Sequence, residues 1–218
     1  MDPAAEARFE SVVAELHDIL VKTNEDVEGN CVYTNLTLER NDEYSSKRRN
    51  LYRLAKESRK ICEIGFNAGH SASLLMMGSQ TSYGAGAECV FFDLGQHRYT
   101  TLCFEKLKQM MPSVSTAMYL GDSRVLLPRW IEANKDQMGT FDMVHVDGGH
   151  SMDCAASDLL CAVLLTRPGG VIVVDDVDSK EILPVVNTWM LSGYLSIDLG
   201  YESTEYSPHV ILRKALRT

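Results

Sequence analysis

Residues 61–71 constrain the fold of this chain more than any other segment. They begin with a short apolar run that carries an acid, Glu63, and continue through Gly65 and Gly69 into a helix-like segment. Glycine has no Cβ, so a glycine turn lets the backbone approach a ligand closely. The pattern predicts a strand that leads into a loop around a nucleotide-like cofactor, although an ordinary corner between a strand and a helix has the same appearance. The spacing is not the Gly-x-Gly-x-x-Gly of dinucleotide-binding proteins.

Strand-like and helix-like segments alternate from residue 60 onward. The expected strands are 61–64, 89–92, 117–120, 143–146, 171–174, a stretch near 197–199, and 210–212; the expected helices are 71–77, 99–110, 123–134, 151–165 and 179–191. Short, apolar, β-branched strands such as the fourth and fifth are typical of strands covered on both faces. The alternation therefore predicts a doubly wound α/β sheet. Only a turn containing Pro208 separates the last two strands, so a C-terminal hairpin should add one antiparallel strand to a mostly parallel sheet.

The segment before this alternation is helical and irregular. Residues 3–21 and 45–56 have helical patterns, and the polar residues 22–43 between them are expected to form a loop or cap. A chain of 218 residues favours a single domain. We expect an N-terminal helical cap region over residues 1–58 and a ligand-binding core over residues 59–218.

Composition limits the class of partner. The net charge is −9, so a small-molecule substrate is favoured over nucleic acid. The one basic cluster, Lys47, Arg48 and Arg49, is interpreted as the solvated face of a helix, although Lys47 and Arg48 could instead close over the site together with the first helix. No apolar run approaches the ~20 residues that would cross a membrane, and the acidic N-terminus lacks the features of a signal peptide. The six scattered cysteines are interpreted as reduced core thiols, which favours a cytoplasmic location.

Polar residues follow the second and third expected strands. Ligands of open α/β sheets bind outside the carboxyl ends of the strands. Asp93 could there accept hydrogen bonds from both hydroxyls of a ribose, and Asp122 could reach an adenine amino group. Asp93 could instead be a turn residue, and Asp122 and Ser123 are also good N-caps for the next helix. Both interpretations of each residue stay open.

Three aspartates follow the fourth and fifth expected strands. Asp147 and Asp175 are one helix–strand unit apart, so their strands should be neighbours, and Asp176 follows directly. Three carboxylates at one edge repel unless one is protonated or a cation lies among them. Mg²⁺ prefers oxygen ligands, so a divalent cation held by these aspartates would resolve the conflict. The alternative is that they only cap helices, as we expect for Asp178, which has capping-box spacing with Glu181.

His150 follows two glycines and should lie at the open rim of the pocket. A neutral imidazole there could act as a general base, because its ordinary pKa is about 6.5. It could equally orient a carboxylate or bind the metal. His145 lies inside the fourth expected strand and is interpreted as a core histidine.

Taken in order, these pieces resemble the class I S-adenosylmethionine (SAM) methyltransferases over roughly residues 44–218. The matching features are residues 63–69, Asp93, Gly121-Asp122-Ser123, residues 141–147, and residues 167–170. The resemblance implies a Rossmann-like, seven-stranded, doubly wound sheet. It also implies a SAM site formed by Glu63, Gly65, Phe66, Asn67, Gly69, Ser71, Asp93, Asp122, Ser123 and Asp147.

The aspartates at the strand ends also resemble those of the cation-dependent small-molecule O-methyltransferases, such as the catechol and caffeoyl-CoA types. Asp176 stands where those enzymes have asparagine, and His150 stands where they have a catalytic lysine. The Asp-Gly-Gly-His segment that ends at His150 is similar to a methyltransferase subgroup with mostly unassigned substrates. The resemblance implies methyl transfer to a hydroxyl of a small molecule, assisted by Mg²⁺ on Asp147, Asp175 and Asp176, with Asp147 and His150 catalytic. A homodimer is common among such enzymes.

Three alternatives stay open at this point. The chain could be a metal-independent N- or O-methyltransferase whose acids are only structural. It could be a nucleotide-dependent oxidoreductase, although it lacks both Gly-x-Gly-x-x-Gly and a Tyr-x-x-x-Lys pair after the fourth strand. It could also be a SAM-binding module without catalysis.

Overall fold

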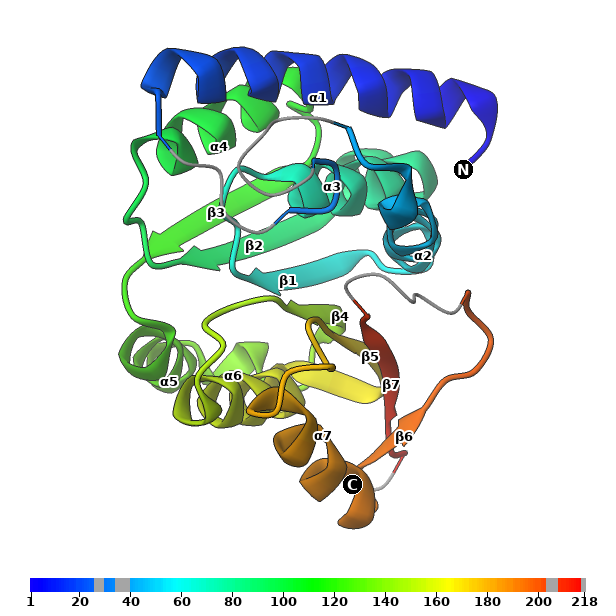
Figure 1. The fold of residues 1–218 in the computed structure, drawn as a ribbon. Helices are drawn as coiled ribbons and strands as arrows, with labels where there is room; N and C mark the ends of the chain where they lie inside the picture. The colour runs from blue at the N-terminus through cyan, green and yellow to red at the C-terminus, as the bar shows by residue number, and fades with distance from the viewer. Residues whose placement is uncertain (26–29, 34–39, 203–207, 217–218) are drawn as a thin grey trace.

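The computed structural model describes residues 1–25, 30–33, 40–202 and 208–216. Within them, seven strands form one sheet in the order β3-β2-β1-β4-β5-β7-β6 (Figure 1). The strands are β1 (Lys60–Ile64), β2 (Glu88–Asp93), β3 (Ser115–Leu120), β4 (Phe141–Val146), β5 (Thr166–Val174), β6 (Leu195–Ile197) and β7 (Val210–Lys214). All neighbouring pairs are parallel except the two that β7 makes with β5 and β6. The predicted sheet with one antiparallel C-terminal strand is confirmed.

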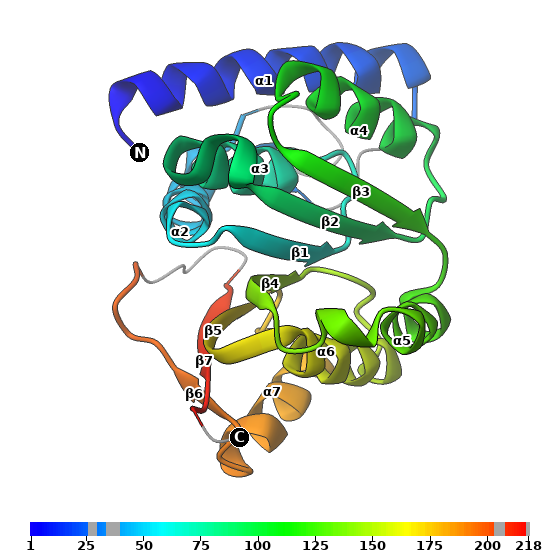
Figure 2. The ribbon, with the colours of Figure 1, turned by 180° about the vertical axis from the view of Figure 1, so that it is seen from behind.

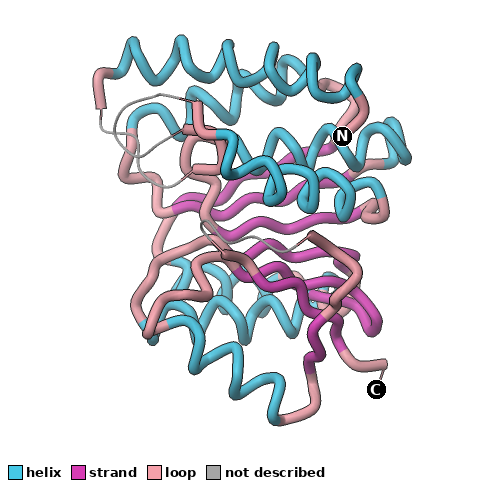
Figure 3. Tube along the Cα trace, turned by 45° about the vertical axis from the view of Figure 1, so that its right-hand side comes forward, coloured by secondary structure: helices cyan, strands magenta, loops and turns pink. Residues whose placement is uncertain are grey.

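Helices cover both faces of this sheet. They are α1 (Pro3–Thr23), α2 (Ser45–Lys56), α3 (His70–Tyr83), α4 (Arg98–Met110), α5 (Ser123–Ala133), α6 (Met152–Leu165) and α7 (Ile182–Leu191), with short 3₁₀ turns η1 (Asp42–Tyr44), η2 (Gly84–Gly86) and η3 (Lys135–Gln137). Helices α1–α4 lie on one side and α5–α7 on the other, and α1 packs across α3 and α4 as an outer layer (Figures 2 and 3). No helix among the described residues is long and apolar enough to cross a membrane.

Each central strand supplies two cores. Met143 and Val171 belong to the apolar cluster under α1–α4, and their neighbours Val144 and Ile172 belong to the cluster under α5–α7. Successive strand side chains point to opposite faces, so a fully apolar strand serves both clusters. Helix α3 follows β1 on one face and α6 follows β4 on the other. The neighbouring strands β1 and β4 therefore form the point of reversal where a crevice opens in such sheets.

Helix α3 is longer than the pattern predicts. The expected end at residue 77 is wrong, because Gly78 does not stop the helix. A Cβ at Gly78 would lie 2.6 Å from the Cβ of Ala55 and 2.7 Å from the carbonyl oxygen of Tyr52. This glycine therefore lets α2 pack closely against α3, and the helix continues to Tyr83.

The start of α7 also differs from the prediction. The helix begins at Ile182, and no side chain caps it. The Oγ of Ser179 accepts a hydrogen bond from the backbone N–H of Glu181 at 3.2 Å, which makes a turn of the residues before the helix. The capping box expected from Asp178 and Glu181 is therefore wrong.

The N-terminal cap is largely as predicted. Helix α1 begins after Asp2, whose side chain accepts a hydrogen bond from the N–H of Ala5 at 2.9 Å. The buried face of α1 consists of Phe9, Val12, Val13, Leu16 and Leu20. Of the loop expected over 22–43, residues 26–29 and 34–39 lie outside the described residues.

Candidate active site

A cavity of about 910 Å³ opens at the carboxyl ends of β1, β2 and β4. Its wall runs from the glycine loop after β1, past the ends of β2 and β3, to the loop after β4, and Tyr44 and Lys47 of the cap close one side. Predicted site residues on this wall are Gly65, Phe66, Asn67, Ser71, Asp93, Asp122, Ser123, Asp147, His150 and Asp176. The volume matches that of typical ligand pockets, about 300–1,000 Å³.

Two glycines shape the loop between β1 and α3. Gly65 has a φ of +95°, and a Cβ on it would lie 1.9 Å from the carbonyl oxygen of Asp147. Only a glycine therefore allows the loop after β1 to touch the loop after β4. Gly69 has a φ of +80°, and its Cβ would lie 2.7 Å from the ring of Phe66. Gly69 supports the loop from behind and is not on the cavity wall itself.

Asp93 anchors the glycine loop at the mouth of the cavity. Its two carboxylate oxygens accept hydrogen bonds from the N–H groups of Asn67 and Gly95, each at 2.7 Å. Asn67 has a φ of +51°, and its Oδ1 accepts a hydrogen bond from the hydroxyl of Tyr99 at 2.8 Å. Each carboxylate oxygen has a second lone pair, so Asp93 is equipped to bind a hydroxyl pair while it holds the loop.

Asp122 is the N-cap of α5, which confirms the capping interpretation of this residue. Its carboxylate accepts a hydrogen bond from the N–H of Arg124 at 3.0 Å and also pairs with the guanidinium of that residue at 2.7 Å. Asp122 and Ser123 nevertheless lie on the cavity wall, and Ser123 is 3.6 Å from the Sγ of Cys154. Capping and ligand contact are therefore compatible at this position.

The basic cluster of α2 does not form a solvated face. Lys47 is only 4% exposed and Arg48 only 2%, so the expectation is wrong for both. The ammonium of Lys47 pairs with Asp175, and the guanidinium of Arg48 donates to the carbonyl oxygens of Cys31 and Asn41, each at 3.0 Å. Lys47 lies four residues before the buried Leu51, and residues at that spacing share one helix face.

The third basic residue, Arg49, does lie at the surface. Its guanidinium pairs there with Glu202 at 2.5 Å.

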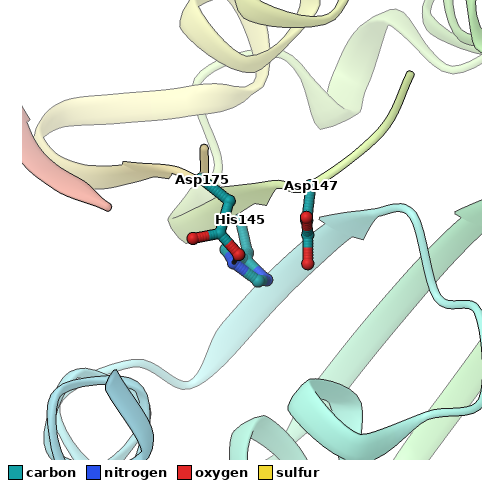
Figure 4. Close-up of side chains that lie close together, drawn as sticks. All are labelled: His145, Asp147 and Asp175. Atoms are coloured by element: carbon teal, nitrogen blue, oxygen red, sulfur yellow. Dashed lines mark ion pairs between the residues drawn. The ribbon is translucent and has the colours of Figure 1, made fainter. Parts of the chain in front are cut away.

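A chain of buried charges runs behind the cavity. His145 and Glu63 are both fully buried, and the Nδ1 of His145 is 2.9 Å from the Oε1 of Glu63. The Nε2 of His145 is 3.8 Å from the carboxylate of Asp175, which lies beside it in Figure 4. Burial lowers the pKa of His145, but the neighbouring carboxylates of Asp175 and Glu63 outweigh it and raise this pKa to about 10. The core histidine is confirmed as buried.

Glu63 was expected to contact the cofactor. Its side chain instead pairs with the buried His145 and does not line the cavity. It contacts His145, which in turn lies beside Asp175. Glu63 therefore supports the residues at the strand ends and does not contact the ligand itself.

The two buried acids at the strand ends differ in their environment. Burial raises the pKa of Asp175, but the charges of Lys47 and His145 outweigh burial and hold this pKa well below its usual range. Burial and then the charge of Asp175 raise the pKa of Asp147 above its usual range. Neighbouring carboxylates with separated pKa values are typical of active sites.

His150 stands at the open rim, as predicted. Its side chain is 64% exposed, and its Nε2 is 3.0 Å from a carboxylate oxygen of Asp176. That hydrogen bond raises the pKa of His150 above its ordinary value, against a smaller opposing effect of burial. Asp176 has a φ of +53°, so the chain turns sharply directly after Asp175.

The structure does not bring the three aspartates together as one ligand set. Within the described part of the chain, possible ligand atoms within 4.8 Å of one another form two groups, His145/Asp147/Asp175 and Asp147/His150/Asp176. In the first group, the ammonium of Lys47 already pairs with Asp175, and His145 offers a nitrogen where Mg²⁺ prefers oxygen. The second offers only two carboxylates and an imidazole, whereas Mg²⁺ prefers oxygen ligands. The residues present therefore do not fit the expected Mg²⁺ site.

The family follows from comparison with known proteins. A model of the family described as "Methyltransferase domain" matches residues 62–177, which is more than half of the chain. The chain belongs to this methyltransferase family. Its glycine loop, Asp93, the loop after β4, and Asp175 with Asp176 all fall within the matched range.

Solved structures show the same methyltransferase fold. Cofactor-bound Rv0187 from MTB is 16% identical, with a TM-score of 0.66, and the match covers 95% of this chain and 91% of that one. The O-methyltransferase TomG from Streptomyces achromogenes, in complex with SAM, is 17% identical with a TM-score of 0.64 over 94% and 90%. The SAH-bound Podospora anserina methyltransferase PaMTH1 is 13% identical with a TM-score of 0.66 over 98% and 97%. A comparison with curated proteins gave no significant match.

Sequence reasoning missed part of this methyltransferase's cavity wall. The missed residues include Asn30, Cys31, Tyr44, His70 and Cys154. His70 follows Gly69 directly, and burial lowers its pKa to about 4, so it is neutral. The four-residue spacing between Lys47 and the buried Leu51 indicates that Lys47 lies on the buried face of α2. Asn30 and Cys31 gave no signal, because only the docking of the cap brings them to the cavity.

Proposed function

We propose that this methyltransferase uses SAM to methylate a hydroxyl group of a small molecule. One observation carries the proposal: a single cavity joins the glycine loop and Asp93 at one end to Asp147 and His150 at the other. The structural relatives support it, because TomG was solved with SAM and the Bacillus cereus O-methyltransferase with SAH.

In this proposal the cofactor lies along the strand ends. The loop of Gly65, Phe66, Asn67 and Ser71 binds the amino-acid part, with Gly69 shaping the loop from behind. Asp93 binds the ribose hydroxyls, and Asp122 with Ser123 borders the adenine. Bound SAM supplies an electrophilic methyl group on a positively charged sulfur. Asp147, at the carboxyl end of β4 beside the loop after β1, lies next to that position.

His150 is the proposed general base. A hydroxyl acceptor must lose its proton as its oxygen bonds to the methyl carbon, and the electron pair of the breaking carbon–sulfur bond stays on sulfur. The imidazole takes the proton, and Asp176 at 3.0 Å stabilises the resulting imidazolium. Most of the remaining rate enhancement comes from holding the two reactants in line.

A divalent cation receives no step in this mechanism. The ion pair between Lys47 and Asp175 favours the metal-independent alternative over the Mg²⁺-assisted one that the resemblance implied. The family match disfavours a nucleotide-dependent oxidoreductase. The rim pair of His150 and Asp176 favours catalysis over a SAM-binding module without activity.

The proposal also includes a cytoplasmic location and a homodimer. Buried, unpaired cysteines among the described residues agree with a cytoplasmic location. A homodimer is expected from the resemblance alone.

A radiochemical assay tests the proposed function. Methyl-labelled SAM is incubated with the protein and a panel of small phenols and other hydroxyl compounds, and label in the product is counted. We expect transfer to one class of hydroxyl compound, and we expect His150→Ala to lower kcat by roughly 10²- to 10⁴-fold, the usual contribution of a general base. Affinity for SAH, measured by calorimetry, should stay nearly unchanged in that variant. Labelling of amines only would contradict the hydroxyl assignment.

A further inference from the structure

Lys47 brings a buried positive charge into the acid cluster from outside the sheet. Its side chain is 5% exposed and that of its partner Asp175 is 1% exposed. Lys47 lies on α2 of the cap, whereas Asp175 follows β5 in the core. Lys47 also lies on the cavity wall together with Asp147.

A buried ammonium already faces the acids of this cluster. Lys47 comes from α2, and the acids Asp147 and Asp175 follow β4 and β5. Isolated buried charges are strongly unfavourable, so buried carboxylates need cations close by. A divalent ion added here would have to displace the ammonium from Asp175 or share that carboxylate with it.

We propose that Lys47 is the resident cation of the acceptor end of this cavity and takes the place of a divalent metal. This inference rests on the proposed function, which assigns the cavity to SAM and the methyl acceptor. Lys47 acts as a positioning residue: it holds Asp175 in place and supplies a fixed positive charge beside Asp147. The cap thereby completes the site, since the ammonium beside Asp175 comes from α2.

Manganese titration of the intact protein tests this directly. Mn²⁺ is added to the wild-type protein, with and without SAH, and free ion is counted by electron paramagnetic resonance. We expect no stoichiometric Mn²⁺ binding. Stoichiometric binding to the wild-type protein, lost in Asp147→Asn, would overturn the proposal.

Removing the ammonium should create the metal site that it replaces. In Lys47→Met, Asp147 and Asp175 lose their partner, and we expect affinity for Mn²⁺ to rise by about 10- to 100-fold, the range over which groups around metal ligands change affinity. Mn²⁺ or Mg²⁺ should then raise the Tm of this variant and leave the wild-type Tm unchanged. Lys56→Met, on the exposed face of the same helix, is the matched control and should behave like the wild type.

Folding failure does not remove the test. If Lys47→Met does not fold, the double variant Lys47→Met with Asp175→Asn removes the carboxylate that pairs with the ammonium and should fold without binding Mn²⁺. A double variant that stays unfolded, or that binds Mn²⁺ stoichiometrically, would overturn the proposal. A Lys47→Met variant that folds with unchanged Tm and gains no Mn²⁺ affinity would overturn the proposal. Failure of the proposed function gives a different result, because SAH would then not bind even to the wild-type protein.

Discussion

Asp93 combines two tasks in one carboxylate, since it fixes the glycine loop and also faces the cavity. We predict that Asp93→Ala weakens SAM binding. Hydrogen bonds to a charged group contribute about 1.5–3 kcal/mol, which corresponds to roughly 10- to 150-fold in Kd. Calorimetric titration with SAM measures this, and Asp93→Asn, which keeps one acceptor oxygen, should lose less. A Kd for Asp93→Ala equal to the wild-type value would show that the ribose lies elsewhere.

The pair of His150 and Asp176 predicts a pH profile. A general base acts in its neutral form, so kcat should rise with pH through the pKa of His150. Asp176 raises that pKa, and the inflection should therefore lie above the ordinary value of about 6.5. Asp176→Asn removes the negative partner and should move the inflection to lower pH. An inflection that stays in place in this variant would assign the titration to another group.

The glycine loop and the loop after β4 form a single unit at the scale of secondary structure. Gly65→Ala places a Cβ 1.9 Å from the carbonyl oxygen of Asp147 and forces the loops apart. Overpacking of this kind costs about 1–3 kcal/mol, and each kcal/mol lowers Tm by roughly 2–4 °C in a chain of this size. Gly139→Ala is the control, because Gly139 also has a positive φ but nothing within 4 Å of the added Cβ. Equal Tm losses in the two variants would show that backbone strain alone, and not the contact between loops, accounts for the effect.

Elements whose partners are close in sequence could be predicted well. Strand-helix alternation and the apolar strands were enough for the sheet and its antiparallel β7, and the expected bounds of α2 match the observed Ser45–Lys56. The end of α3 was missed because Gly78 packs against a different helix, a contact that periodicity within one segment does not record. Lys47 was assigned to solvent by its charge, although its spacing to Leu51 placed it on the buried face.

At the scale of the whole molecule, the sequence predicts only the part of the site that the sheet topology determines. Topology places Asp93, Asp147, Asp175 and Asp176 at one edge, because parallel strands end together. Sheet topology does not predict how the N-terminal cap packs on the core. This packing brings Lys47 into the site and adds a positive charge there. The division of one acid cluster into a buried ion pair and an exposed rim pair is therefore a tertiary property.

The dependence of the site on the cap predicts cooperative unfolding. Lys47 and Arg48 bind residues of the core and of the cap, and α2 packs closely on α3. We therefore expect residues 1–58 and 59–218 to unfold together as one domain, with equal calorimetric and van't Hoff enthalpies in differential scanning calorimetry. Two separated transitions would contradict this single-domain proposal.

A crystal structure of the protein with SAH, grown with Mg²⁺ present, tests the central claim most directly. The account predicts the amino-acid end of SAH on the loop from Gly65 to Ser71, the ribose on Asp93, and the sulfur facing Asp147 and His150. It also predicts the ammonium of Lys47 on Asp175 with no Mg²⁺ beside it. SAH bound away from the glycine loop would contradict the proposed function, and Mg²⁺ held by Asp147, Asp175 and Asp176 would contradict the role of Lys47.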